Sequence, residues 1–153
     1  MEFNAADIFE GVVDRVPERE AVVYGSTRLT YKELDARSNK AANALKKLGI
    51  KKESHIGIYA FNCIEWLEIM LGAYKLCAIP ININYRYVEE ELKYLIDNAD
   101  IEAIFYQKQF STKLNNIKND LPLLKDFVSI DDGTDSSDIV ENNLDFEGLI
   151  ANE

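Results

Sequence analysis

Hydrophobic and polar positions along the chain predict an alternation of helices and short strands. Helical periodicity and capping signals predict helices over residues 6–16, 31–48, 64–77, 88–98 and 110–119. Short apolar runs bounded by turn residues predict strands over residues 55–60, 78–83, 101–106 and 126–130. Strands that alternate with helices at this spacing indicate a parallel sheet with helices packed on its faces. We therefore expect an α/β fold in which right-handed crossovers connect the strands.

A short hairpin is expected ahead of this sheet. Residues 21–31 read AVVYGSTRLTY, which is two strand-like runs around a Gly-Ser turn. Thr30 and Glu33 have the spacing of a capping box, in which each side chain bonds to the backbone N–H of the other residue. Gly49 follows the last apolar position of the helix and suits its C-terminal end. At the start of the later helix 64–77, Asn62 is expected to be the N-terminal cap.

The last part of the chain differs in composition from the rest. All 17 basic residues lie at or before Lys125, whereas residues 131–153 contain 8 acidic residues and no basic one. The stretch DDGTDSSDIVENN is also rich in turn residues. We therefore divide the chain into an α/β domain over residues 1–130 and an acidic, mobile tail over residues 131–153. Residues 144–150 have room for one or two amphipathic helical turns.

The overall composition is that of a globular domain. The 153 residues are 47% hydrophobic, and their net charge is −10. No basic face is available for nucleic acid, and no apolar run reaches the roughly 18 residues that a membrane span needs. The two cysteines lie far apart in the sequence, and the N-terminus has no basic region typical of a signal peptide. We therefore expect a cytoplasmic protein that neither binds nucleic acid nor spans a membrane.

This chain lacks the residues that most catalytic and metal-binding sites require. A single histidine and two distant cysteines do not make a Cys/His zinc site. His55 begins a predicted strand, so we interpret it as a strand-end residue. Cys63 lies between a strand and a helix N-terminus, a position that suits either a nucleophile or, as we favour, a small core or capping residue. The 7 glycines form neither of the two common phosphate-binding motifs, and residues 89–91 (three glutamates) are expected to be a solvated first helical turn.

The carboxyl ends of the predicted strands are the expected ligand edge of a parallel sheet. Asn62 follows one predicted strand, and Tyr85 and Arg86 follow the next. Arg86 could bind a phosphate or a carboxylate, or it could tie its loop to a helix as a structural residue. Asn62, Tyr85 and Arg86 are therefore the candidate ligand contacts. No catalytic, cofactor-binding or metal-ligating residue is assigned.

Four motifs follow one another in a fixed order along the first 130 residues. They are LTYxELxxxSNxxAxxL at residues 29–45, NCxEW at 62–66, GAYKLxAIPIN at 72–82 and NYRY at 84–87. Together they resemble the N-terminal part of acyl-CoA synthetases, which belong to the adenylate-forming, AMP-binding enzyme superfamily. The last motif, with the acidic helix start after it, resembles the fatty-acyl-CoA ligase branch. The resemblance covers residues 3–130 and implies a Rossmann-like N-terminal subdomain.

This resemblance implies a parent enzyme of fatty acid metabolism. Members of the superfamily use ATP, Mg²⁺ and CoA to convert a carboxylic acid into acyl-CoA, AMP and pyrophosphate. Their phosphate-binding loop and catalytic lysine have no counterpart in these 153 residues, which end before that loop would begin. We therefore expect an N-terminal fragment of a ligase that is inactive by itself and has no cofactor of its own.

Two descriptions of the chain remain open at this point. As a truncated ligase, it would expose apolar surface where the remainder of the enzyme docks, and it would tend to self-associate. As a stand-alone small α/β module, it would bind a ligand or a partner without catalysis and would be monomeric.

Overall fold

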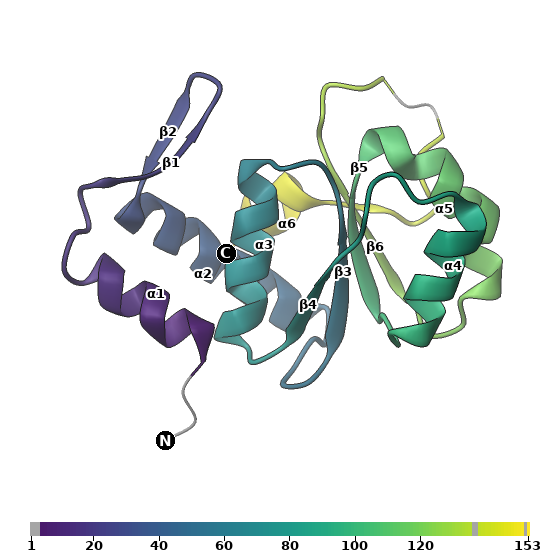
Figure 1. The fold of residues 1–153 in the computed structure, drawn as a ribbon, viewed down its shortest axis with the longest axis horizontal. Coiled ribbons are helices and arrows are strands. Elements are labelled where there is room, and N and C mark those ends of the chain that lie inside the picture. Colours follow the sequence, from purple (N-terminus) through teal and green to yellow (C-terminus); the bar gives the residue numbers. More distant parts are fainter. Residues whose placement is uncertain (1–3, 136–137, 152) are drawn as a thin grey trace.

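The computed structural model of the chain describes residues 4–135, 138–151 and 153. Its centre is a sheet with the strand order β4-β3-β5-β6-β7, in which every neighbouring pair is parallel (Figure 1). The strands are β3 (His55–Tyr59), β4 (Ile79–Asn82), β5 (Ala103–Gln107), β6 (Asp126–Ile130) and β7 (Leu144–Asp145). This topology confirms the predicted α/β fold with a parallel sheet.

Helices cover both faces of this sheet. Figure 1 shows α2, α3 and α6 on one side and α4 and α5 on the other. Their bounds are α2 Tyr31–Lys47, α3 Ile64–Lys75, α4 Glu89–Asn98, α5 Ser111–Ile117 and α6 Phe146–Ala151. Along β5, Ala103 and Phe105 belong to the core under α2, α3 and α6, whereas Ile104 and Tyr106 belong to the core under α4 and α5. Successive side chains of a strand point to opposite faces of the sheet, so β5 contributes to both hydrophobic cores. For this reason β5 is apolar almost throughout.

The closest helix packing is between α2 and α3. Gly72 of α3 faces the backbone of α2, and a Cβ placed on it would lie 3.0 Å from the Ala41 Cβ and from the Ala42 nitrogen. A larger residue at this position would push the two helices apart. The glycine in the GAYKL motif thus has a packing role.

The N-terminal region is built as the sequence predicts. Helix α1 (Ala5–Val13) precedes an antiparallel hairpin of β1 (Glu20–Tyr24) and β2 (Thr27–Thr30), which projects away from the sheet (Figure 1). Thr30 and Glu33 form the expected capping box at the start of α2, and Gly49 follows α2 with a φ of +86°. Glycine adopts this left-handed conformation without strain.

Several predicted helix boundaries differ from the structure. Helix α1 ends at Val13 and not at residue 16, and α3 ends at Lys75 and not at residue 77. The N-terminal cap of α3 is Cys63 and not Asn62, and it makes no side-chain capping bond. Cys63 is buried, and α3 begins at Ile64, the residue at which the predicted helix starts. The predicted helix 110–119 is a short α5 with a 3₁₀ turn at each end, η1 (Lys108–Phe110) and η2 (Lys118–Asp120).

The sheet extends beyond residue 130. Strand β7 pairs with β6, and the expected helical turns near the C-terminus form α6. Val140, Phe146 and Ile150 are buried. The described part of the acidic segment thus adds a strand and a helix to the domain, while the mobility of residues 131–153 stays a prediction. None of the described helices combines the length and the apolar character that crossing a bilayer requires.

Candidate functional site at the carboxyl edge of the sheet

The loops after β3, β4, β5 and β6 gather at the carboxyl edge of the sheet because all four strands are parallel. This edge contains all three candidate ligand contacts. Asn62 is exposed in the loop after β3 and lines a cavity of about 330 Å³ between that loop, the β1 strand of the hairpin and α3. The remaining lining is mostly apolar and consists of Val22, Val23, Tyr24, Cys63, Trp66 and Leu67.

Tyr85 and Arg86 lie together in the loop after β4. The Tyr85 ring packs against the Phe61 ring with 4.4 Å between centroids, and the Arg86 guanidinium carbon lies 5.5 Å from the centre of the Tyr85 ring. Asn84 holds this turn, because its Oδ1 accepts a hydrogen bond from the backbone N–H of Arg86 at 3.0 Å. The loop therefore presents a cation stacked on an aromatic ring. Phe61 connects it to the loop that carries Asn62.

A second cavity at this edge was not predicted from the sequence. It has a volume of about 440 Å³ and is lined by Tyr24, Phe61, Cys63, Glu65, Gln107, Gln109, Asp131 and Asp132. Gln107 is buried at the end of β5, where its Oε1 accepts hydrogen bonds from the Phe61 backbone N–H at 3.0 Å and from Gln109 Nε2 at 3.3 Å. The available signal was a polar residue that ends the apolar strand AIFYQ.

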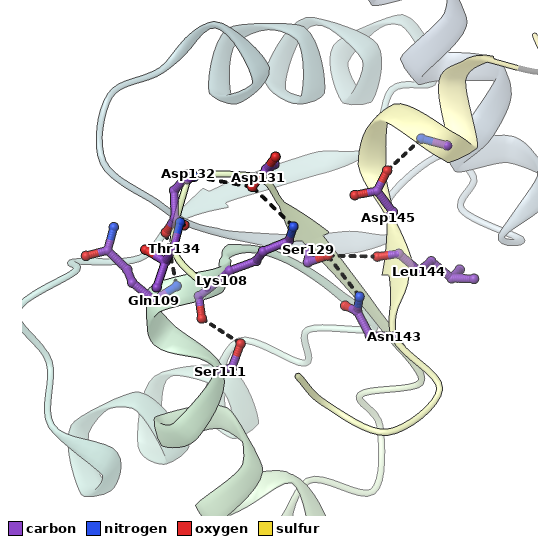
Figure 2. A network of polar contacts seen from close by, with 12 residues as sticks. Lys108, Gln109, Ser111, Ser129, Asp131, Asp132, Thr134, Asn143, Leu144 and Asp145 are labelled. Carbon is purple, nitrogen blue, oxygen red and sulfur yellow. Dashed lines mark hydrogen bonds and ion pairs between the residues drawn. The ribbon is translucent and has the colours of Figure 1, made fainter. Parts of the chain in front are cut away.

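Two aspartates after β6 fix one wall of this cavity (Figure 2). Asp131 Oδ1 pairs with Lys108 Nζ at 3.1 Å, and Asp132 accepts hydrogen bonds from the backbone N–H groups of Gln109 at 3.0 Å and Thr134 at 2.9 Å. The hydrogen bond from Lys108 lowers the pKa of Asp131. Partial burial would raise the pKa of Asp132, but the backbone hydrogen bonds outweigh it and the pKa is lowered. Both carboxylates are therefore ionised at neutral pH.

Cys63 and His55 have structural roles. Cys63 is buried at the N-cap position of α3, and burial raises the pKa of its thiol to about 12, which disfavours the thiolate that a nucleophile needs. His55 begins β3 at the opposite edge of the sheet, and its Nδ1 lies 2.5 Å from the Ala99 carbonyl oxygen. Because a carbonyl only accepts, Nδ1 carries the proton of this hydrogen bond. Neither residue offers a base or nucleophile to the carboxyl edge.

A buried ion pair lies away from the site, among α2, α3 and α6. The Glu68 carboxylate is fully buried and accepts hydrogen bonds from Arg37 Nε and from Arg37 Nη2, the latter at 2.9 Å. Arg37 Nη2 also lies 2.5 Å from Glu147 Oε1 of α6. Burial raises the pKa of Glu68, and Arg37 opposes this effect. The arrangement ties α6 to the two longest helices and is structural.

The described residues by themselves do not form a binding site for the triphosphate of ATP with Mg²⁺. Within residues 4–135, 138–151 and 153, no group of three His, Cys, Asp or Glu side chains is placed to hold a metal ion. The loops after β3, β4 and β5 contain no glycine, and the loop after β6 contains only Gly133, which is too few for backbone N–H groups to surround phosphate oxygens. No chemical step is therefore derived for these residues alone.

Comparison with known proteins identifies relatives among CoA ligases. A 3-oxocholest-4-en-26-oate–CoA ligase of Rhodococcus rhodochrous is 38% identical over 151 residues, which cover 99% of this chain and 27% of the relative. The putative acyl-CoA synthetase YngI of Bacillus subtilis is 32% identical over 117 residues, which cover 74% of this chain and 21% of the relative. The chain thus spans about a quarter of the length of the first of these curated relatives and about a fifth of the second.

Solved structures share the fold. The anthranilate CoA ligase AuaEII, solved in complex with anthranoyl-AMP, superposes with a TM-score of 0.88 at 24% identity, over 99% of this chain and 27% of that one. The N-terminal domain of FACL13 from Mycobacterium tuberculosis gives 0.81 at 22% identity, over 84% of this chain and 34% of that one.

A family model described as "AMP-binding enzyme" matches residues 9–148, which include every strand of the sheet. The order of the motifs, the parallel sheet and this match agree, and the chain therefore belongs to the AMP-binding enzyme family.

Proposed function

We propose that the chain forms the N-terminal sheet domain of an ATP-dependent ligase that joins a carboxylic acid to CoA and releases AMP and pyrophosphate. The 38% identity over 151 residues to a named CoA ligase is the observation that carries this proposal. Relatives in Mycobacterium tuberculosis and Mycolicibacterium smegmatis are named for medium- and long-chain fatty acids as well as for the steroid acid. The proposed substrate class is accordingly a hydrophobic carboxylic acid.

The 153-residue chain is proposed to be inactive by itself. The parent enzyme would use ATP, Mg²⁺ and CoA, but transfer of an adenylyl group needs preorganised positive charge around the triphosphate. Neither a phosphate-binding loop nor a set of magnesium ligands is present among the described residues. The remainder of the ligase must supply both.

The carboxyl edge is the proposed ligand-facing side of this domain. Arg86 is exposed and stacked on Tyr85, so its charge is available to a phosphate or a carboxylate. Asn62 and Tyr85 would contact the same ligand from the neighbouring loops. These roles belong to the assembled enzyme, since the edge alone shows no catalytic group.

The remainder of the ligase is the proposed partner. Val23, Tyr24, Phe61 and Tyr85 expose between a third and a little over half of their surface near this edge. A docked domain would cover them, and without one the chain would self-associate in the cytoplasm, its proposed location.

The alternative is a stand-alone module that binds a ligand without catalysis. The two cavities at the carboxyl edge favour it, because they are formed within this chain. The two functions differ in whether a thioester is made.

Acyl-CoA formation tests the proposal. The protein that carries these residues is purified from its own cells and incubated with ATP, Mg²⁺, CoA and either palmitate or 3-oxocholest-4-en-26-oate, and products are identified by mass spectrometry. We expect an acyl-CoA together with an equal amount of AMP. Saturable ligand binding without thioester or AMP would favour the binding module.

A further inference from the structure

The side chain of Gln107 has a fixed orientation. Its carboxamide lies 3.0 Å from the backbone nitrogen of Phe61. A backbone N–H can only donate, so the atom that faces it is the oxygen Oε1 and the other atom is Nε2. Gln109 Nε2 donates to the same oxygen. Two donors thus define which way the Gln107 amide points.

The Nε2 group of Gln107 is left without a protein acceptor. Among the described residues, the Gln107 side chain makes hydrogen bonds only through Oε1, and the residue as a whole is 5% exposed. No fully buried side-chain nitrogen or oxygen in the described chain lacks a partner. Nε2 must therefore reach open space, and Gln107 lines the 440 Å³ cavity. A donor that opens onto a cavity is available to a ligand acceptor in place of water.

The other walls of the cavity select the kind of ligand. Glu65, Asp131 and Asp132 bring three carboxylates, of which only Asp131 is paired with a lysine. The Glu65 carboxylate has more lone-pair sites than its contact with the Cys63 thiol occupies, so it can accept a further hydrogen bond. Negative charge on a ligand would be repelled, whereas an N–H donor would be bound. Tyr24 and Phe61 add apolar surface to the same space.

We propose that this cavity binds an uncharged ligand that carries an amide group. The amide carbonyl accepts a hydrogen bond from Gln107 Nε2, the amide N–H donates to Glu65, and an apolar substituent lies against Tyr24 and Phe61. The volume is within the range of small-molecule sites, about 300–1,000 Å³. The same chemistry is offered by a small amide or by a peptide segment. The site is separate from Arg86, which suits an anion, and it does not depend on ligase activity.

Isothermal titration calorimetry on the full chain tests this site with a matched pair of probes. N-acetylphenylalaninamide carries the amide, and N-acetylphenylalanine replaces its terminal amide by a carboxylate. We expect saturable binding of the amide and binding of the acid at least about tenfold weaker. A tetrapeptide with blocked termini that contains phenylalanine tests whether the ligand is a small amide or a peptide segment. Binding tighter than that of the small amide identifies a peptide segment as the ligand, and equal or weaker binding identifies a small amide.

The Gln107→Glu variant tests the donor itself. Its carboxylate keeps an acceptor for the Phe61 N–H but loses the Nε2 donor, so the dissociation constant of the amide should rise by about tenfold or more. Asn119→Asp makes the same charge change at an exposed residue of η2 and should leave binding unchanged. Glu65→Gln should strengthen binding of the acid probe. Absence of amide binding, or equal binding by wild type and Gln107→Glu with unchanged thermal unfolding, would overturn the proposal.

Discussion

Phe146, the first residue of α6, lies edge-on against Phe105 of β5, with 6.2 Å between ring centroids and an angle of 86° between the ring planes. Both side chains are buried. This contact joins the C-terminal helix to the middle of the sheet. The acidic segment that contains α6 is thereby anchored by an apolar residue, although its composition is that of a solvated chain.

Replacing Phe146 by alanine should destabilise the whole domain. Truncation of a buried phenylalanine leaves a cavity and typically costs about 3–5 kcal/mol. Urea unfolding followed by circular dichroism measures the loss. Leu123→Ala is the control, because Leu123 is 46% exposed and its truncation should cost about 0.5 kcal/mol or less. Equal stability of the two variants would mean that α6 is not docked in solution.

Replacing Arg37 by glutamine should leave Glu68 as a buried charge without its partner. Such a loss costs about 3–5 kcal/mol, and the lower end is expected because the Arg37 side chain is 31% exposed. The free energy of unfolding at pH 7 measures this effect. Replacing both residues by apolar ones, Arg37→Met with Glu68→Leu, should recover much of the loss. No recovery in the double variant would contradict the assigned cause.

The cost of Arg37→Gln should depend on pH. Burial raises the pKa of Glu68 above its ordinary value of 4.5, and removing Arg37 raises it further. Below 4.5 the carboxyl group is protonated in both the folded and the unfolded chain, so no buried charge is left to penalise the fold. The full loss of stability caused by Arg37→Gln appears only above the pKa that Glu68 has in the folded chain. Unfolding curves should therefore show a smaller gap between variant and wild type at pH 4 than at pH 7, and a constant gap would exclude Glu68 as the cause.

The two cysteines should differ in reactivity. Cys77 is exposed, whereas Cys63 is buried and its pKa is raised to about 12. Only the thiolate reacts with iodoacetamide, so brief treatment of the folded chain at pH 8 should alkylate Cys77 alone. Peptide mass spectrometry locates the label, and the urea-unfolded chain, in which both residues react, is the control. Rapid labelling of Cys63 in the folded chain would show that the loop after β3 opens.

Local signals predicted most of the fold. The capping box of Thr30 and Glu33 depends on residues three apart, and the strands β3, β5 and β6 are short runs that are mostly apolar and mostly buried. Both kinds of signal lie within a short window of sequence. Strand β7 has only two residues, too few for any periodicity, so its pairing with β6 could not be predicted.

Features that depend on distant residues could not be predicted. Arg37 meets Glu68 and Glu147 only because α2, α3 and α6 pack together, and no pattern near Arg37 indicates those partners. Gln107 likewise gains its role from Phe61 in the loop after the neighbouring strand β3. The carboxyl edge was located from the expected parallel direction of the predicted strands, whereas the cavity beside Gln107 required the side chains.

ATP–pyrophosphate exchange tests the central claim most directly, because it measures adenylation before CoA is involved. The purified 153-residue chain is assayed with Mg²⁺ and a panel of fatty acids, and a longer protein carrying the same residues, where cells make one, serves as the positive control. We predict exchange by the longer protein and none above background by the 153-residue chain. Robust, fatty-acid-dependent exchange by the 153-residue chain would contradict the account.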